Sequence, residues 1–556
     1  MNKKVCSFPI LFALLALLIG TCAVVFPASA QAAPTSTGSI TVSGTVASSY
    51  DAYQIFSANV VDGDSDAKIA TDLAWASDAV RDAALPVLHS AGMPKSQTTA
   101  QEAAEWLNAD SHLTSALSAQ LARSLQSSDA VSEALNAGTA AELTCGYWLI
   151  VADDDAIAQN EAGTAPVMVL VGGSAVTVKP KAATPKVAKH VLEDSAAAWQ
   201  KAADATVADD LYWRLSATVP AGLTAYDTYT VRFVDIMSAG LDPSEVVASM
   251  RVYVAAGADG GFDAVSAGRD GRAGTEPAQG WTDITAQCAT KVAADGKTFT
   301  VRTGDLIAAL GGADAFTAGA RVVAVYNAPL NSACNHGIAK GNPNEVYLRY
   351  PRSPFADQSG DAGFTRTPSD DACAYTWDLA LTKRSSDGDK PLAGAVLSIA
   401  DDRGRTLEAD GTWDAEGKAT VTTGEDGRVT VSGVDSGKLE VCELKAPKGY
   451  TAFKGTRSVT VKAEGLDVDQ VAAAKPKLTI TAESPLRTDS ADGSTGSLEA
   501  SLINTPTGTP PSITTGGFMP STGDMAMYAA AAAAVAGAAL IVVALLVKRG
   551  GGSHKE

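Results

Sequence analysis

The sequence has few basic residues and few histidines for its length. Its 556 residues include 43 lysines and arginines against 62 aspartates and glutamates, for a net charge of −19. Because phosphate binding needs a basic face, this balance argues against a nucleic-acid partner. The five histidines show no paired metal-ligand spacing and no neighbouring nucleophile pattern, and no phosphate-binding loop is present. We therefore expect no metal and no cofactor.

Charge is absent from two apolar segments near the ends of the chain. A basic start and an apolar run over residues 8–26 are followed by the small residues of positions 28–30, at the spacing that signal peptidase requires. We therefore predict that residues 1–30 are a signal peptide. A lipoprotein signal at Cys22 is the weaker alternative because the apolar run continues past that cysteine.

The second apolar segment, residues 525–547, is long enough to cross a bilayer as a helix. The basic tail 548–556 would hold the C-terminus in the cytoplasm while everything upstream is exported. The pentapeptide 519–523 before it resembles the L-P-x-T-G sorting signal, with Met in place of Leu. The resemblance implies sortase cleavage between Thr522 and Gly523, followed by transfer of the acyl group to an amine. A single-pass protein with a chance pentapeptide match is the alternative.

Cysteine is scarce, and its distribution leaves the pairing open. Removal of the signal peptide leaves five cysteines, so at least one stays free or pairs between chains. For an exported protein we expect disulfides between Cys288 and Cys334 and between Cys373 and Cys442. Cys145 stands in an apolar run and is expected to be a buried thiol.

Composition divides the exported part into three domains and a stalk. Residues 31–182 begin and end with β-like runs and contain an Ala-rich helical stretch. Short strands between turn signals continue through residues 183–356 and 370–505, a pattern typical of β-sandwiches. The Pro/Thr/Gly-rich stretch 506–518 is suited to threading a cell wall. The sequence therefore predicts a mainly β fold of tandem sandwiches, with a helical insert in the first domain.

In the third domain, three strands each finish an apolar face with one polar group. Because side chains alternate with period two, Lys383 shares a face with Leu379 and Leu381, and the same test turns Glu443 and Asn504 inward. Burial disfavours the charged forms of an amine and a carboxyl, and a neutral amine is a nucleophile. We expect Lys383 to attack the Asn504 amide while Glu443 donates to the amide carbonyl, leaving an amide cross-link and ammonia. An ordinary buried ion pair is the alternative.

The middle domain repeats this pattern with different residues. Alternation places Lys189, Asp235 and Asn344 on the apolar faces of three strands. We expect a second amide bond between Lys189 and Asn344, with Asp235 as the acid. Lys186 and Asn342 are the neighbouring alternatives.

Short motifs in all three domains resemble one known family. In the third domain the motifs are residues 381–383, 391–395 and 442–450. In the middle domain they are residues 229–241 and 341–348, and in the first domain residues 50–56 and 146–150. They resemble the Gram-positive backbone pilins, and those of the third domain look like a Cna B-type, SpaA-like domain. The run 442–450 resembles the family's E-box. The resemblance implies Ig-like β-sandwiches and the cross-linking roles given above.

Pilin shafts of this family carry an exposed lysine in a Y-P-K-N motif at the end of the first domain. Residues 178–182 occupy that place here, although the residues flanking the lysine differ from the motif. The resemblance implies Lys181 as the acceptor of the next subunit's acyl group, with Lys179 and Lys186 as competitors. A solvated linker lysine is the simpler alternative.

These features together predict the structural shaft subunit of a covalently polymerised pilus on a Gram-positive cell wall. We expect a secreted chain, first held as a membrane-bound precursor and finally anchored to peptidoglycan. The expected partners are pilus-specific and housekeeping sortases, identical subunits and peptidoglycan. The alternative is a wall-anchored adhesin or accessory pilin that binds host ligands without polymerising. Apart from single-turnover cross-linking we expect no enzyme, because no catalytic constellation stands outside the proposed cross-link sites.

Overall fold

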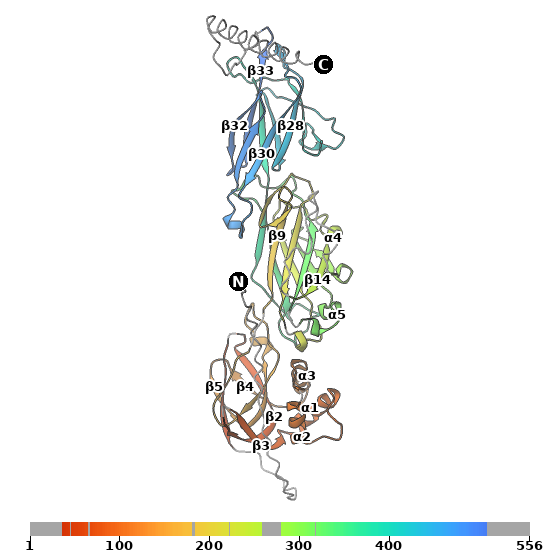
Figure 1. Cartoon of the computed structure of the whole chain (residues 1–556), viewed down its shortest axis with the longest axis vertical. Helices are drawn as coiled ribbons and strands as arrows, with labels where there is room; N and C mark the ends of the chain where they lie inside the picture. The colour runs from red at the N-terminus through yellow and green to blue at the C-terminus, as the bar shows by residue number, and fades with distance from the viewer. Residues whose placement is uncertain are drawn as a thin grey trace, which may run out of the picture.

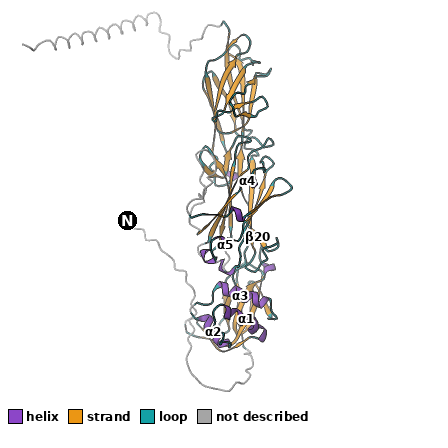
Figure 2. Ribbon diagram, turned by 90° about the vertical axis from the view of Figure 1, so that its right-hand side faces the viewer, coloured by secondary structure: helices purple, strands orange, loops and turns teal. Residues whose placement is uncertain are grey.

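The computed structural model describes the chain from residue 36 to residue 508 with internal gaps. The described ranges are 36–44, 46–64, 67–109, 111–180, 184–221, 223–257, 280–316 and 319–508. They form three domains arranged end to end (Figure 1), and helices gather mainly in the domain at one end (Figure 2). The prediction of a mainly β, multidomain fold is confirmed. Over these ranges, no helix has the length and apolar character that crossing a membrane requires.

The N-terminal domain packs a helical insert against β-sheets. Its elements are β1 (Thr37–Val42), β2 (Ser49–Asp62), β3 (Lys68–Trp75), α1 (Asp78–Ser90), α2 (Ala100–Asn108), α3 (Ser115–Gln126), β4 (Ser132–Asn136), β5 (Ala140–Thr144), β6 (Gly146–Ala152), β7 (Val167–Val171) and β8 (Val176–Val178). One sheet has the order β5-β1-β8, and the other has the order β3-β2-β6-β7 with β4 beside β2. Alternation along β2 turns Tyr50 toward the small sheet and Ile55 toward the helices, so one strand serves two cores.

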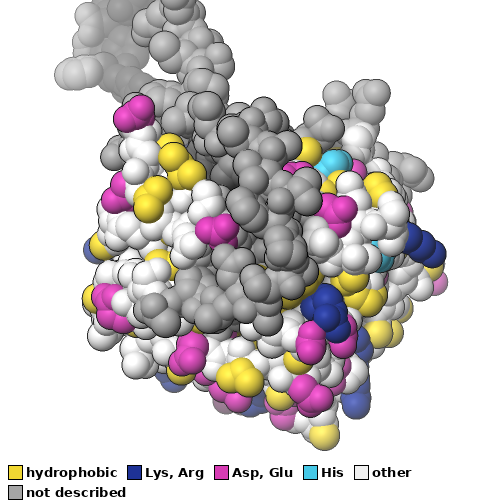
Figure 3. Space-filling model, turned by 90° about the horizontal axis from the view of Figure 1, so that it is seen from below, with side chains coloured by type: hydrophobic (Ala, Val, Ile, Leu, Met, Phe, Trp, Pro, Cys, Tyr) yellow, Lys and Arg dark blue, Asp and Glu magenta, His cyan; other side chains and the backbone are white. Residues whose placement is uncertain are grey.

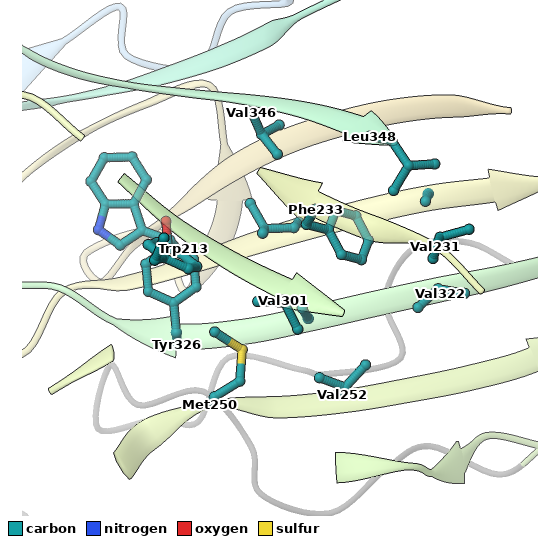
Figure 4. Close-up of a cluster of buried hydrophobic side chains, with 14 of the residues drawn as sticks. Trp213, Val231, Phe233, Met250, Val252, Val301, Val322, Tyr326, Val346 and Leu348 are labelled. Carbon is teal, nitrogen blue, oxygen red and sulfur yellow. The ribbon is translucent and has the colours of Figure 1, made fainter. Parts of the chain in front are cut away.

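The middle domain is a sandwich of two sheets. Its elements are β9 (Lys186–Glu193), β10 (Ala198–Gln200), β11 (Ala202–Asp204), β12 (Tyr212–Val219), β13 (Arg232–Met237), α4 (Val246–Ser249), β14 (Arg251–Ala256), β15 (Thr282–Asp283), β16 (Ala289–Val292), β17 (Thr298–Arg302), α5 (Leu306–Ala309), β18 (Ala320–Asn327), β19 (Asn342–Pro351), β20 (Phe364–Arg366) and β21 (Asp370–Tyr375). One sheet has the order β10-β9-β12-β18-β14-β15, and the other has the order β11-β21-β19-β13-β17-β16 with β20 on β19. Apolar residues of both sheets meet between them (Figure 4).

The boundary between the second and third domains lies later than the sequence indicated. We expected residues 370–505 to form the third domain, but β21 hydrogen-bonds to β11 and β19 of the middle domain. The residues of β21 therefore complete the middle sheet, and the C-terminal domain begins with Trp377. The polar composition before residue 371 hid a strand whose partners come from far away in the sequence.

The C-terminal domain is a second sandwich. Its strands are β22 (Trp377–Ser385), β23 (Val396–Ala400), β24 (Thr406–Leu407), β25 (Trp413–Asp414), β26 (Val421–Thr422), β27 (Arg428–Val434), β28 (Gly437–Lys445), β29 (Tyr450–Thr451), β30 (Thr456–Glu464), β31 (Lys477–Ala482), β32 (Leu486–Asp492) and β33 (Ser497–Pro506). In one sheet the first strand, β22, lies parallel to the last strand, β33. The facing sheet has the order β25-β24-β23-β28-β30-β31. The entry and exit strands of this domain are therefore direct neighbours.

On the face of the molecule seen from below, charged residues are spread out instead of forming one patch (Figure 3). The end view of the molecule shows acidic side chains at many separate places, with fewer basic ones among them (Figure 3). The described residues on this face form no basic stripe of the kind that binds phosphates.

Polar contacts hold the middle and C-terminal domains together. Trp377 Nε1 of β22 donates to Asp204 Oδ2 of β11 at 2.6 Å. Arg405 of the C-terminal domain makes two hydrogen bonds to the Asp209 carboxylate, at 2.6 and 2.8 Å. His336 Nδ1 lies 2.7 Å from Asp378 Oδ1 across the same junction. Two-point arginine contacts restrict rotation, so this junction is more than a flexible link.

The His336–Asp378 contact makes the junction sensitive to pH. The hydrogen bond to Asp378 raises the pKa of His336 from 6.5 to about 10. A group whose pKa is raised in the folded state stabilises that state below its ordinary pKa and loses the effect as pH rises through the raised value. We expect His336→Gln to lower the melting temperature of the C-terminal domain at about pH 6 and to have no effect above about pH 10. Scanning calorimetry at both values checks this, and an equal loss at both would contradict it.

Two buried lysine–acid–asparagine sites

In the C-terminal domain, three strands bring Lys383, Glu443 and Asn504 together. Lys383 and Asn504 lie on the parallel neighbours β22 and β33, and Glu443 reaches them from β28 of the facing sheet. Lys383 Nζ donates to Asn504 Oδ1, and the same nitrogen lies 3.1 Å from Glu443 Oε1. Asn504 Nδ2 donates to Glu443 Oε1 at 2.8 Å. The three groups form a closed triangle.

This site is dry. The side chains of Lys383 and Glu443 are fully shielded from solvent, and Phe453 covers the amine with its ring while its backbone N–H donates to Glu443 Oε2 at 3.0 Å. Burial lowers the pKa of Lys383 from 10.5 to about 8, against the opposing attraction of Glu443. The neutral, nucleophilic form of the amine is therefore far more accessible here than in water.

The contact of the acid differs from the sequence-based expectation. We expected Glu443 to donate to the carbonyl oxygen of Asn504, but Glu443 accepts from the amide nitrogen, while the Lys383 amine donates to the carbonyl oxygen. The amine emerges from the same sheet as the amide and occupies the carbonyl side. The acid comes from the opposite sheet and faces the nitrogen that would leave as ammonia. This placement suits proton delivery to the leaving group.

The middle domain holds a second buried set. Lys189 of β9, Asp235 of β13 and Asn344 of β19 are all fully buried. Lys189 Nζ hydrogen-bonds to Asp235 Oδ2, and it lies 5.5 Å from the centre of the Trp213 ring. Burial lowers the pKa of Lys189 to about 8 and raises the pKa of Asp235. Since β9 and β19 belong to different sheets, a bond between these side chains would join the two layers of the sandwich.

A tyrosine that the sequence analysis missed stands at the centre of the middle site. The Tyr326 hydroxyl lies 2.9 Å from Lys189 Nζ, 2.9 Å from Asp235 Oδ2 and 2.8 Å from Asn344 Nδ2. Figure 4 shows Tyr326 beside Trp213 at one end of the middle core. Every residue of β18 is buried, so no exposed position marks which face of the strand turns inward. The alternation of Ala320, Val322 and Ala324 before the tyrosine was the available signal.

The two neighbouring candidates in the middle domain have other roles. Lys186 is exposed at the start of β9. Asn342 is buried, but its amide is used by the adjacent loop: Nδ2 donates to Asn335 O at 2.9 Å and Oδ1 accepts from Asn335 N at 2.8 Å. Of Asn342 and Asn344, it is therefore Asn344 whose side chain lies at the site of Lys189 and Asp235.

The structure contradicts the expected disulfides. Cys288, Cys334, Cys373 and Cys442 are all free thiols. Cys373 lies in β21 at the end of the middle domain, whereas Cys442 faces outward from β28, opposite to the buried face of that strand. The Cys288 thiol instead donates to the Ile284 carbonyl at 3.3 Å. For Cys373 and Cys442, spacing along the chain was a poor guide because β21 belongs to the middle domain and not to the third domain, where we expected it.

Of the other predicted positions, the structure describes some and not others. Cys145 is a buried free thiol, as expected. Lys179 is exposed just after β8. The predicted signal peptide, the acceptor Lys181, the cleavage site at Thr522 and Gly523, and the apolar segment 525–547 lie outside the described residues.

The fold and the two sites thus define a mainly β, multidomain chain with buried lysine, acid and asparagine groups in two sandwiches. Residues 378–475 match the family described as the SpaA prealbumin-like fold domain, which confirms the resemblance noted in the sequence. That segment includes Lys383 and Glu443, whereas Asn504 follows it. The matched segment coincides with most of the C-terminal domain.

The chain also resembles proteins that are already known. The chain is 30% identical over 143 residues to the trypsin-resistant surface T6 protein of Streptococcus pyogenes serotype M6, an alignment covering 24% of each chain. Among solved structures, the T6 backbone pilin of S. pyogenes matches with a TM-score of 0.46 and 16% identity, over 86% of this chain and all of that one. The major pilin SpaD of Corynebacterium diphtheriae matches over the same shares, with a TM-score of 0.41 and 16% identity.

Proposed function

We propose that this protein is the structural shaft subunit of a covalently polymerised pilus, stabilised by two internal amide bonds. The observation that carries the proposal is the closed, dry triangle of Lys383, Glu443 and Asn504, whose amine already touches the amide that it would attack. The second buried set, with Lys189 and Asn344, supports the same chemistry in the middle domain. The similarity to the T6 surface protein and to the SpaA domain supports the setting.

The chemistry at the C-terminal site is an intramolecular condensation. Lys383 passes a proton to Glu443 and its neutral Nζ attacks Cγ of Asn504. Glu443 then protonates the departing Nδ2, ammonia leaves, and Nζ gives its surplus proton back to Glu443, which ends protonated. The fold supplies the proximity, which in well-oriented intramolecular reactions contributes up to about 7 to 11 kcal/mol. The same condensation would join Lys189 to Asn344, with Asp235 as the acid.

Assembly would use residues outside the sandwiches. A sortase would cleave after Thr522 and transfer the Thr522 carbonyl to Lys181 of a neighbouring subunit, and a final transfer to peptidoglycan would anchor the fibre. The exported chain would first be held at the membrane by the segment 525–547.

The intact mass of the exported chain tests the internal bonds. Two amide bonds predict a mass lower than the sequence mass by two ammonias, and tryptic fragments joined through Lys383–Asn504 and Lys189–Asn344 locate them. A chain of unmodified mass would contradict the proposal and leave two buried ion-paired lysines.

The acceptor lysine is tested on cell-wall extracts. We expect Lys181→Ala to abolish the ladder of high-molecular-weight polymers, while Lys179→Ala and Lys186→Ala, as matched controls in the same junction, leave it intact. A persistent ladder in Lys181→Ala would move the acceptor elsewhere. Absence of a ladder in the unaltered strain would favour the wall-anchored adhesin or accessory pilin.

A further inference from the structure

The two buried sites differ in how the acid reaches the amide. In the C-terminal domain, Glu443 Oε1 accepts directly from Asn504 Nδ2. In the middle domain, the contacts of Asn344 Nδ2 and of Asp235 Oδ2 converge instead on the hydroxyl of Tyr326. The tyrosine oxygen thus stands where the carboxylate oxygen stands in the other site.

We propose that Tyr326 is a catalytic residue of the middle domain, relaying the proton from Asp235 to the departing nitrogen of Asn344. This inference rests on the proposed Lys189–Asn344 bond and assigns a role to a residue outside the lysine–acid–asparagine set. The hydroxyl contacts the attacking nitrogen, the acid and the leaving nitrogen, at 2.9, 2.9 and 2.8 Å.

The relay balances without any added reactant. Lys189 gives one proton to Asp235, and its Nζ forms a bond to Cγ of Asn344. Tyr326 then protonates Nδ2 while its own proton is replaced by the one on Asp235, and the Cγ–Nδ2 bond breaks to release ammonia. The former amine returns its surplus proton to Asp235. The amide, free ammonia and a protonated Asp235 remain, and Tyr326 ends as it began.

The surroundings of Tyr326 fit a relay. Burial raises its pKa well above the ordinary value, so the hydroxyl keeps its proton until a neighbour replaces it. The ring is fixed against Phe299 at 4.8 Å between centroids, which holds the oxygen in place. Asn344 Oδ1 and Asp235 Oδ1 are buried without hydrogen-bond partners, so no contact between the acid and the amide replaces the hydroxyl bridge.

Tyr326→Phe tests the relay because it removes only the hydroxyl. We expect the middle bond to form at least about 10²-fold more slowly, in the range that general acid–base catalysis supplies, while the C-terminal bond forms normally in the same molecule. The measurement is the time course of ammonia loss by intact mass after synthesis, with peptide mapping of each bond. Tyr350→Phe is the matched control, because Tyr350 shares the buried face of β19 with Asn344 and its hydroxyl has no partner.

A second variant separates proton transfer from positioning. Fluorotyrosine at position 326 keeps the ring and the hydrogen bonds but makes the hydroxyl more acidic, so a relay predicts a changed rate and a shifted pH profile for the middle bond. An unchanged rate in Tyr326→Phe, or a rate insensitive to fluorination, would overturn the relay. Absence of the middle bond from the unaltered protein would instead refute the proposed cross-link itself.

Discussion

Asn504→Ala is expected to leave the C-terminal domain without its covalent bond and to lower its stability sharply. Lys383 and Asn504 are separated by 121 positions, so the proposed bond would close almost the entire domain into a loop. By analogy with disulfides, closing a loop of about 100 residues restricts the unfolded chain enough to stabilise the fold by about 4 to 5 kcal/mol. Denaturant unfolding of the variant measures this loss, and trypsin digestion at physiological temperature should turn from resistance to cleavage.

The middle domain provides the internal control for this variant. Its Lys189–Asn344 bond should still form, so the variant should lose one ammonia where the unaltered protein loses two. Glu443→Gln keeps both Lys383 and Asn504 but removes the acid. This variant should therefore also lose one ammonia, from the middle domain alone. Two ammonias lost from Asn504→Ala would place the bond on another residue.

The sequence was sufficient to place the side chains of Lys383, Glu443 and Asn504 in the core because their strands alternate strictly. Lys383, Glu443 and Asn504 each continue an apolar face, and in the structure each side chain is at least nine-tenths buried. To expect that these side chains meet, it was enough to assume that the apolar faces of their three strands pack into one core. The SpaA-like motifs added the expectation that these strands pack together.

What the sequence left undetermined depends on which strands become neighbours. Tyr326 lies in a strand buried on both faces, where alternation gives no contrast between inward and outward positions. β21 pairs with β11, about 170 residues earlier, and no local pattern announces such a partner. The expected pairing of Cys373 with Cys442 failed for the same reason, since it assumed that both cysteines belong to the third domain.

The extension of the C-terminal domain under force, measured by pulling on single molecules, should differ strongly between the unaltered protein and Asn504→Ala. In the C-terminal domain, tension entering through β22 reaches Lys383, and the amide bond would pass it directly to Asn504 on the adjacent exit strand, β33. The 120 or so residues between them would then carry no load. We expect the unaltered domain not to lengthen under force, whereas Asn504→Ala should extend by roughly 400 Å, about 3.3–3.6 Å for each released residue.

The N-terminal domain is the control for this experiment, and it links the cross-links to polymerisation. Among its described residues, the buried polar side chains are those of Ser57 and Ser118, with no lysine–acid–asparagine set. If subunits are joined from Thr522 to Lys181, the force bypasses this domain and runs only through the two sandwiches that carry the sets. Pulled from its own N-terminus, the first domain should therefore unfold and lengthen. Pulled from position 181, the unaltered protein should lengthen at most by the segment between Asn344 and Lys383, which neither proposed bond bridges. Lengthening beyond that segment would show that the cross-links do not bear the load.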